Sequence, residues 1–171
     1  MDLRLVQLCL LLSACSFSSV LSCRWIQHKF QHHHGVSLDL IRKILLLIER
    51  EVSKNDDYYY LKKDTIICPE KQILFVIQAL MEITVLFDDA VVPWDAKKLA
   101  DFLNVMHEEI DGLRSCGAYK MKRNKKLHLY FERLRHMTEM KTDRDHSWEI
   151  VRKRVISFMN QLEFFSFHTH V

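Results

Sequence analysis

Glycine and proline are scarce in this chain, and this scarcity constrains the fold more than any other feature. Among 171 residues there are three glycines and two prolines. A β-sandwich or a β-barrel needs many tight turns, and glycine and proline build most of them. The sequence therefore predicts an all-α fold, in which a few long helices are joined by few connections.

The spacing of apolar residues supports this prediction, most clearly over residues 145–162. Apolar side chains recur there every three or four positions: Trp148, Val151, Val155, Phe158 and Leu162. On a helix of about 3.6 residues per turn they form one stripe, which must pack against other helices. Arg152 and its neighbours Lys153, Ile156 and Ser157 lie behind the stripe, so we expect them to face outward.

Four earlier segments show the same spacing. With the last one, the expected helices are 37–52, 70–88, 94–115, 121–140 and 145–162. We expect Ser37 to cap the first helix, and Pro69 and Pro93 to open the next two, because the first turn of a helix needs no amide hydrogen from proline. Short connections make neighbouring helices antiparallel, whereas a long one permits a parallel crossover. The pattern predicts a bundle of five main helices with up-up-down-down type topology and a long loop after the first helix.

The N-terminal residues have the features of a secretory signal. One basic residue precedes an apolar run at 5–12, and a region of small residues follows it. Ser22 suits the last cleaved position, with cuts after Ser16 or Ser18 as alternatives. The apolar run is too short to span a membrane, which takes about 20 residues. We expect residues 1–22 to be a signal peptide.

Residues 23–171 are then expected to form a single secreted domain without membrane insertion. The formal net charge of +3 is too small to indicate a nucleic-acid partner. The 25 basic residues are nearly balanced by 22 acidic ones, which speaks against a cationic antimicrobial protein. No nucleophile–base pairing, metal-ligand spacing or glycine-rich phosphate loop is found, so we expect neither an enzyme nor a cofactor.

Histidines are concentrated at 23–36, which we expect to be an irregular leader. His28 and His32 would share a helix face, and with His33 and His34 they raise the alternative of a metal site. No carboxylate or cysteine nearby completes such a site. We therefore interpret the histidines as part of a solvated leader.

Three cysteines remain once the signal is removed: Cys23, Cys68 and Cys116. An odd number in a secreted protein leaves one cysteine over. Spacing alone does not choose among the three pairings.

The connection at 53–69 contains three consecutive tyrosines followed by Leu61, Lys62 and Lys63. Such a long loop is either laid across the bundle for packing or serves as a contact surface. Aromatic groups beside cations are typical of binding hot spots, so both interpretations stay open.

Two motifs resemble the type I interferons. Residues 148–152, W-E-I-V-R, are similar to the last-helix signature C-A-W-E-V-V-R of that family. The sequence Trp94-Asp95, with the apolar positions that follow it and Cys116, is similar to the third helix of the family. His146 stands where the mammalian signature has cysteine, and the cysteine pattern resembles that of the fish two-cysteine group.

The resemblance implies a helical cytokine with one family disulfide, Cys23–Cys116. The second family disulfide is missing because of His146, which leaves Cys68 as a buried free thiol, with dimerisation through Cys68 as the alternative.

The resemblance also implies a function in innate immunity. The chain would be a secreted, monomeric antiviral cytokine that bridges the two chains of a class II cytokine receptor and induces kinase and transcription-factor signalling and antiviral gene expression. One receptor chain would contact Arg152, Lys153, Ile156, Ser157, Leu61, Lys62 and Lys63. The other would use the outer faces of the second to fourth helices, where no motif fixes residues. The alternatives are another secreted helical cytokine or growth factor, and less readily a cationic antimicrobial protein.

Overall fold

Every regular element in the part of the chain that the structure describes is a helix. The computed structural model describes residues 23–44, 69–88, 90–116, 123–139 and 144–163. The helices are α2 (Arg24–His28), α3 (Phe30–Lys43), α4 (Pro69–Asp88), α5 (Ala96–Arg114), α6 (Lys125–Glu139) and α7 (Arg144–Glu163). The all-α fold predicted from glycine and proline scarcity is confirmed.

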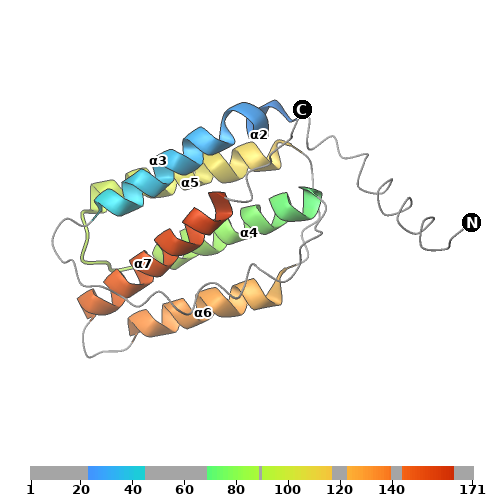
Figure 1. Cartoon of the computed structure of the whole chain (residues 1–171). Coiled ribbons are helices and arrows are strands. Elements are labelled where there is room, and N and C mark those ends of the chain that lie inside the picture. Colours follow the sequence, from blue (N-terminus) through green and yellow to red (C-terminus); the bar gives the residue numbers. More distant parts are fainter. Residues whose placement is uncertain (1–22, 45–68, 89, 117–122, 140–143, 164–171) are drawn as a thin grey trace, which may run out of the picture.

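The five long helices form a closed ring of neighbours (Figure 1). Helix α3 packs on α5, α5 on α4, α4 on α6, α6 on α7, and α7 on α3. The short α2 lies against α3 and α5. Figure 1 shows α3 and α5 side by side at one edge of the molecule, with α6 at the opposite edge.

Pairs of contacts along the helices give the orientation of α3. His34 and Lys43 of α3 contact Glu109 and Lys98 of α5, in opposite order along the two helices. Toward α7, His34 contacts the Met159 carbonyl and the Ile41 carbonyl contacts Arg152, again in opposite order. Helix α3 is therefore antiparallel to both α5 and α7. The complete up-up-down-down path stays a prediction.

The apolar stripes predicted for the later helices are buried, except that Met137 of α6 is only partly buried. On α7, all five stripe residues from Trp148 to Leu162 are buried. The ring of Trp148 lies 5.7 Å from Trp94 and 5.9 Å from Phe87, measured between centroids. Aromatic rings prefer such offset and edge contacts, and they bury a large apolar area. This cluster joins α7 to α4 and to the segment before α5.

Helix α4 is buried over more of its circumference than one stripe. One face of the helix is formed by the buried Ile73, Ile77, Leu80, Thr84 and Phe87. Beside this face, Val76, Ala79 and Ile83 are also buried. A helix that is apolar on most sides needs neighbours on most sides. Helix α4 has them because it packs on α5 and on α6.

Side-chain caps, rather than prolines alone, set the helix starts. Asp95 caps α5, and its carboxylate accepts a hydrogen bond of 3.0 Å from the Lys98 amide. This bond holds the pKa of Asp95 below its usual value. Pro93 precedes the cap, so its predicted place in the first turn is wrong, whereas Pro69 is the first residue of α4. Asn124 caps α6 in the same way, and the helix starts later than predicted.

The prediction for the N-terminal segment is wrong. Residues 23–36 are largely helical, and α3 begins at Phe30. Ser37 does not cap a helix but lies within α3, where its buried hydroxyl donates to the His34 carbonyl at 2.9 Å. The stripe of α3 runs from Phe30 to Ile41 and includes two polar residues, which hid it from the apolar spacing. Residues 45–52 of the expected helix lie outside the described residues.

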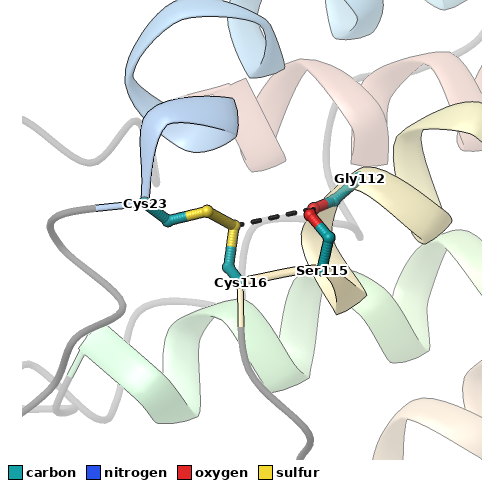
Figure 2. Close-up of a disulfide and its surroundings, with 4 residues drawn as sticks. All are labelled: Cys23, Gly112, Ser115 and Cys116. Carbon is teal, nitrogen blue, oxygen red and sulfur yellow. Dashed lines mark hydrogen bonds between the residues drawn. A yellow bond between two sulfur atoms is a disulfide. The ribbon is translucent and has the colours of Figure 1, made fainter.

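A disulfide joins Cys23, just before α2, to Cys116, just after α5 (Figure 2). Their Cα atoms are 5.4 Å apart, and 93 residues separate them in sequence. The pairing implied by the family resemblance is confirmed. Cys68 lies outside the described residues.

Next to the disulfide, Gly112 allows α2 to approach α5 closely. A Cβ atom at this position would lie 1.8–2.4 Å from three atoms of the Trp25 indole, which is closer than any real contact. Trp25 in turn packs edge-on against Phe30, with centroids 6.3 Å apart. The missing side chain at Gly112 is therefore what makes room for the indole.

We predict that Gly112→Ala destabilises the protein by about 1–3 kcal/mol, the cost of overpacking a tight contact. This loss should occur although alanine favours a helix by up to about 1 kcal/mol over glycine. Gly35→Ala is the matched control, because its new Cβ meets nothing within 4 Å on an exposed turn of α3. It should raise stability by about 0.5–1 kcal/mol. If both variants raise the melting temperature, the Trp25 contact is not formed.

We also predict that replacing Cys23 and Cys116 together by serine lowers the free energy of unfolding by about 4–5 kcal/mol. Closing a loop of this length restricts the unfolded chain by that amount in the entropy model. Urea unfolding of the two proteins measures the difference. Peptide mapping without reduction should recover the Cys23–Cys116 peptide, and a bridge that contains Cys68 would contradict the pairing.

Candidate functional site

The four residues of α7 that were expected to face outward do not share one environment. Arg152 is buried, with 7% of its surface exposed, so the outward orientation predicted for it is wrong. The side chain of Lys153 is 30% exposed, and Ile156 and Ser157 are partly exposed. Only these last three can offer atoms to a partner without a change in the helix packing.

Arg152 is held by three hydrogen bonds inside the bundle. Its Nε and Nη2 donate to the two carboxylate oxygens of Glu149 at 2.8 and 2.7 Å. Its Nη1 donates to the Ile41 carbonyl at 2.9 Å. The planar guanidinium can donate two parallel hydrogen bonds to one carboxylate, here that of Glu149, and its remaining edge reaches α3. A single side chain of α7 thus joins two helices.

The position of Ile41 explains why an arginine fits here. Ile41 lies in the last turn of α3, which ends at Lys43. The last carbonyls of a helix lack amide partners within it, and this end of the helix is partly negative. A buried cation that donates to such a carbonyl supplies the missing hydrogen bond and a favourable charge.

An exposed hydrogen bond crosses the same pair of helices. Arg42 Nη2 donates to Asn160 Oδ1 at 2.7 Å. On α7, Asn160 shares one face with Lys153, Ile156 and Ser157, because they precede it by seven, four and three positions. We call this face with Arg42 the α3–α7 seam. Arg42 and Asn160 were not predicted as site residues from the sequence, although the four-residue step from Ile156 to Asn160 could have indicated the second.

A second buried polar group lies between α3, α5 and α7. His34 Nδ1 lies 2.7 Å from Glu109 Oε1, and His34 Nε2 lies 2.9 Å from the Met159 carbonyl. Both side chains are almost wholly buried. Burial alone lowers the pKa of His34, but the hydrogen bond and the charge of Glu109, with the Met159 carbonyl, outweigh it and leave that pKa raised.

The other histidines of the predicted leader have different surroundings. His28 and His32 are exposed on α2 and α3. His33 lies 3.6 Å from the Glu108 carboxylate. Nowhere in the described ranges do three or more histidine, cysteine or acidic side chains gather as a metal ion would require. The interpretation of the segment as a solvated leader is right for His28 and His32 and wrong for His34.

Across the ring from α3, helices α4 and α6 form an open groove. The groove is lined by Gln78, Met81, Glu82, Val85, Arg123, His128, Glu132 and Arg135. Val85 is 59% exposed, an unusual exposure for a large apolar side chain on a helix most of whose described side chains are buried. The groove belongs to the second and fourth predicted helices, where no motif had fixed residues.

The loop residues expected to complete the first surface, Leu61, Lys62 and Lys63, lie outside the described residues. Of the helices that are described, none has the length and apolar character needed to cross a membrane.

We predict that Arg152→Ala lowers the free energy of unfolding by about 3 kcal/mol, the lower end of the range for breaking a buried ion pair. The loss arises because Glu149 is left buried without its partner and the Ile41 carbonyl loses a donor. Lys153→Ala is the matched control one residue away, and its surface ion pair should contribute less than about 1 kcal/mol. Denaturant unfolding compares the two, and an Arg152→Ala protein as stable as the parent would mean that Arg152 is not buried.

Comparison with known proteins gives consistent results. The family model for the interferon alpha/beta domain matches residues 61–166. Interferon a3 of Oncorhynchus mykiss is 29% identical over 163 residues, which cover 91% of each chain. The structure of zebrafish interferon 1 aligns with a TM-score of 0.65 over 84% of this chain and 97% of that one. At 22% identity, this last similarity supports the fold alone.

Proposed function

Because the chain belongs to the interferon alpha/beta family, we propose that it is a secreted antiviral cytokine that bridges the two chains of a class II cytokine receptor. It is a type I interferon cytokine and not an enzyme. In the proposed function, cleavage of residues 1–22 releases the domain, and bringing two receptor chains together starts kinase and transcription-factor signalling and antiviral gene expression.

The observation that carries this proposal is the presence of two separate outward surfaces on one helix bundle. The α3–α7 seam and the α4–α6 groove are not neighbours in the ring, since α5 and the junction of α6 with α7 separate them. A ligand that bridges two receptor chains needs two surfaces that both chains can reach at once. These two surfaces meet that requirement.

We assign the first receptor chain to the α3–α7 seam, through Lys153, Ile156 and Ser157, with Leu61, Lys62 and Lys63 from the loop. The seam presents a cation, an apolar group and a hydroxyl side by side, a mixture that suits a protein partner. The second receptor chain is assigned to the outer faces of α4 to α6, centred on the groove.

Arg152 has a different role in this proposal from the one that the resemblance implies. Each of its three side-chain nitrogens already donates a hydrogen bond within the bundle. It would support the first receptor contact from beneath by holding α7 against the end of α3. Lys153, the next residue, and Ile156, one turn further on, then keep a fixed position for the receptor.

The direct test is to express the full chain, collect the secreted protein and add it to cultured fish cells that respond to interferon a3 of Oncorhynchus mykiss. The proposal predicts induction of antiviral genes, which an antibody against a receptor chain should block. Heat-denatured protein is the control. Absence of induction in cells that respond to the trout protein would contradict the proposal.

A mutant pair tests the assignment of the seam. Lys153→Ala should weaken binding to the isolated ectodomain of the first receptor chain by about tenfold, or about 1.4 kcal/mol, with little change in melting temperature. Lys125→Ala removes an exposed cation from α6, away from the seam, and should leave this affinity unchanged. Equal binding by Lys153→Ala and the parent would remove Lys153 from the contact.

A further inference from the structure

The pair of His34 and Glu109 holds a proton whose position follows from the geometry. His34 Nε2 faces the Met159 carbonyl at 2.9 Å, and a carbonyl oxygen only accepts, so Nε2 carries a hydrogen. His34 Nδ1 faces Glu109 Oε1 at 2.7 Å, a distance at which two lone pairs would repel each other. One further proton therefore lies between Nδ1 and Oε1.

The surroundings favour placing this proton on the imidazole. Glu109 of α5 is the nearest charge, and Glu163 of α7 acts on His34 in the same direction. On α3, the neighbouring His33 faces Glu108 of α5 at 3.6 Å. Two carboxylates on two other helices thus stabilise a positive His34. The pKa of His34 is accordingly raised above its ordinary value of 6.5, although burial alone would lower it.

We propose that protonated His34 and Glu109 form a positioning pair that holds α7 against α3 and α5, and that its hold weakens as the pH rises past the ordinary titration range of an imidazole. The Met159 carbonyl bound by His34 lies between Phe158 and Asn160, within the part of α7 that forms the α3–α7 seam. The consequence for receptor binding rests on the function proposed above, whereas the consequence for folding does not.

The sign of the pH effect follows from proton uptake. Where the folded state has the higher pKa, it binds more protons than the unfolded state between the two values. The stability that His34 supplies is then complete below pH 6.5 and is lost as the pH rises through the folded pKa. Each unit between the two pKa values changes the folding equilibrium about tenfold.

Glu109→Gln reverses this sign. Glutamine has almost the shape of glutamate, and its amide can donate to an unprotonated Nδ1, which favours neutral imidazole. Without the negative charge, burial becomes the dominant effect and should bring the pKa of His34 below 6.5. The variant should therefore gain stability as the pH rises through that range, whereas the parent protein loses it.

The experiment follows the imidazole nitrogens of His34 by NMR in the secreted protein as the pH is raised, alongside melting curves at pH 6 and pH 8.5. The parent should titrate above pH 6.5 and melt at a lower temperature at pH 8.5. Glu109→Gln should titrate below pH 6.5 and show the opposite change in melting. Glu108→Gln, altered at the adjacent exposed carboxylate, is the matched control and should behave like the parent.

Binding to the first receptor chain at the two pH values completes the test. The affinity at pH 6 divided by the affinity at pH 8.5 should be several-fold larger for the parent than for Glu109→Gln. A parent His34 that titrates below pH 6.5, or equal melting trends in the two proteins, overturns the inference. Opposite melting trends with equal affinity ratios overturn the positioning role. If the two proteins show opposite melting trends but neither binds the receptor chain, the inference about the His34–Glu109 pair stands and the proposed function is contradicted instead.

Discussion

Arg152 reaches from α7 into the last turn of α3, and the arrangement of the proposed receptor surface depends on this contact. The guanidinium loses its hydrogen bonds to water when it is buried in the bundle. If one of its protein partners were removed, no water would take that partner's place. The two Glu149 carboxylate oxygens and the Ile41 carbonyl oxygen accept three hydrogen bonds from the guanidinium. His34 makes the equivalent contact from α3 to the Met159 carbonyl, and the two links are seven residues apart on each helix. Between them they fix both the register and the rotation of α7, which apolar packing alone specifies less sharply.

The apolar part of the fold could be predicted from the sequence. The stripes of α5 and α7 follow the period of the helix without interruption, so burial of Phe102 and Val155 could be inferred from spacing alone. The disulfide followed from the family resemblance and not from the cysteine spacing.

The polar interior could not be predicted in this way. His34 and Ser37 interrupt the stripe of α3, and periodicity counts only apolar residues, so the helix appeared to begin too late. The partners that make burial of His34 favourable are 75 and 125 residues away in sequence. Arg152 was misassigned for the same reason, because the carbonyl that it binds is 111 residues away. A charge beside an apolar stripe has the same local pattern whether it is solvated or buried with a distant partner.

We expect Arg152 and Glu149 to act as one buried unit beneath the α3–α7 seam. A double-mutant cycle of Arg152→Ala and Glu149→Ala, measured by denaturant unfolding, tests this dependence. A buried, mutually dependent pair predicts a coupling energy above about 1 kcal/mol, with the double variant losing clearly less stability than the sum of the single losses. Losses that add to within about 0.5 kcal/mol, as independent surface charges do, would show that the two side chains are not coupled.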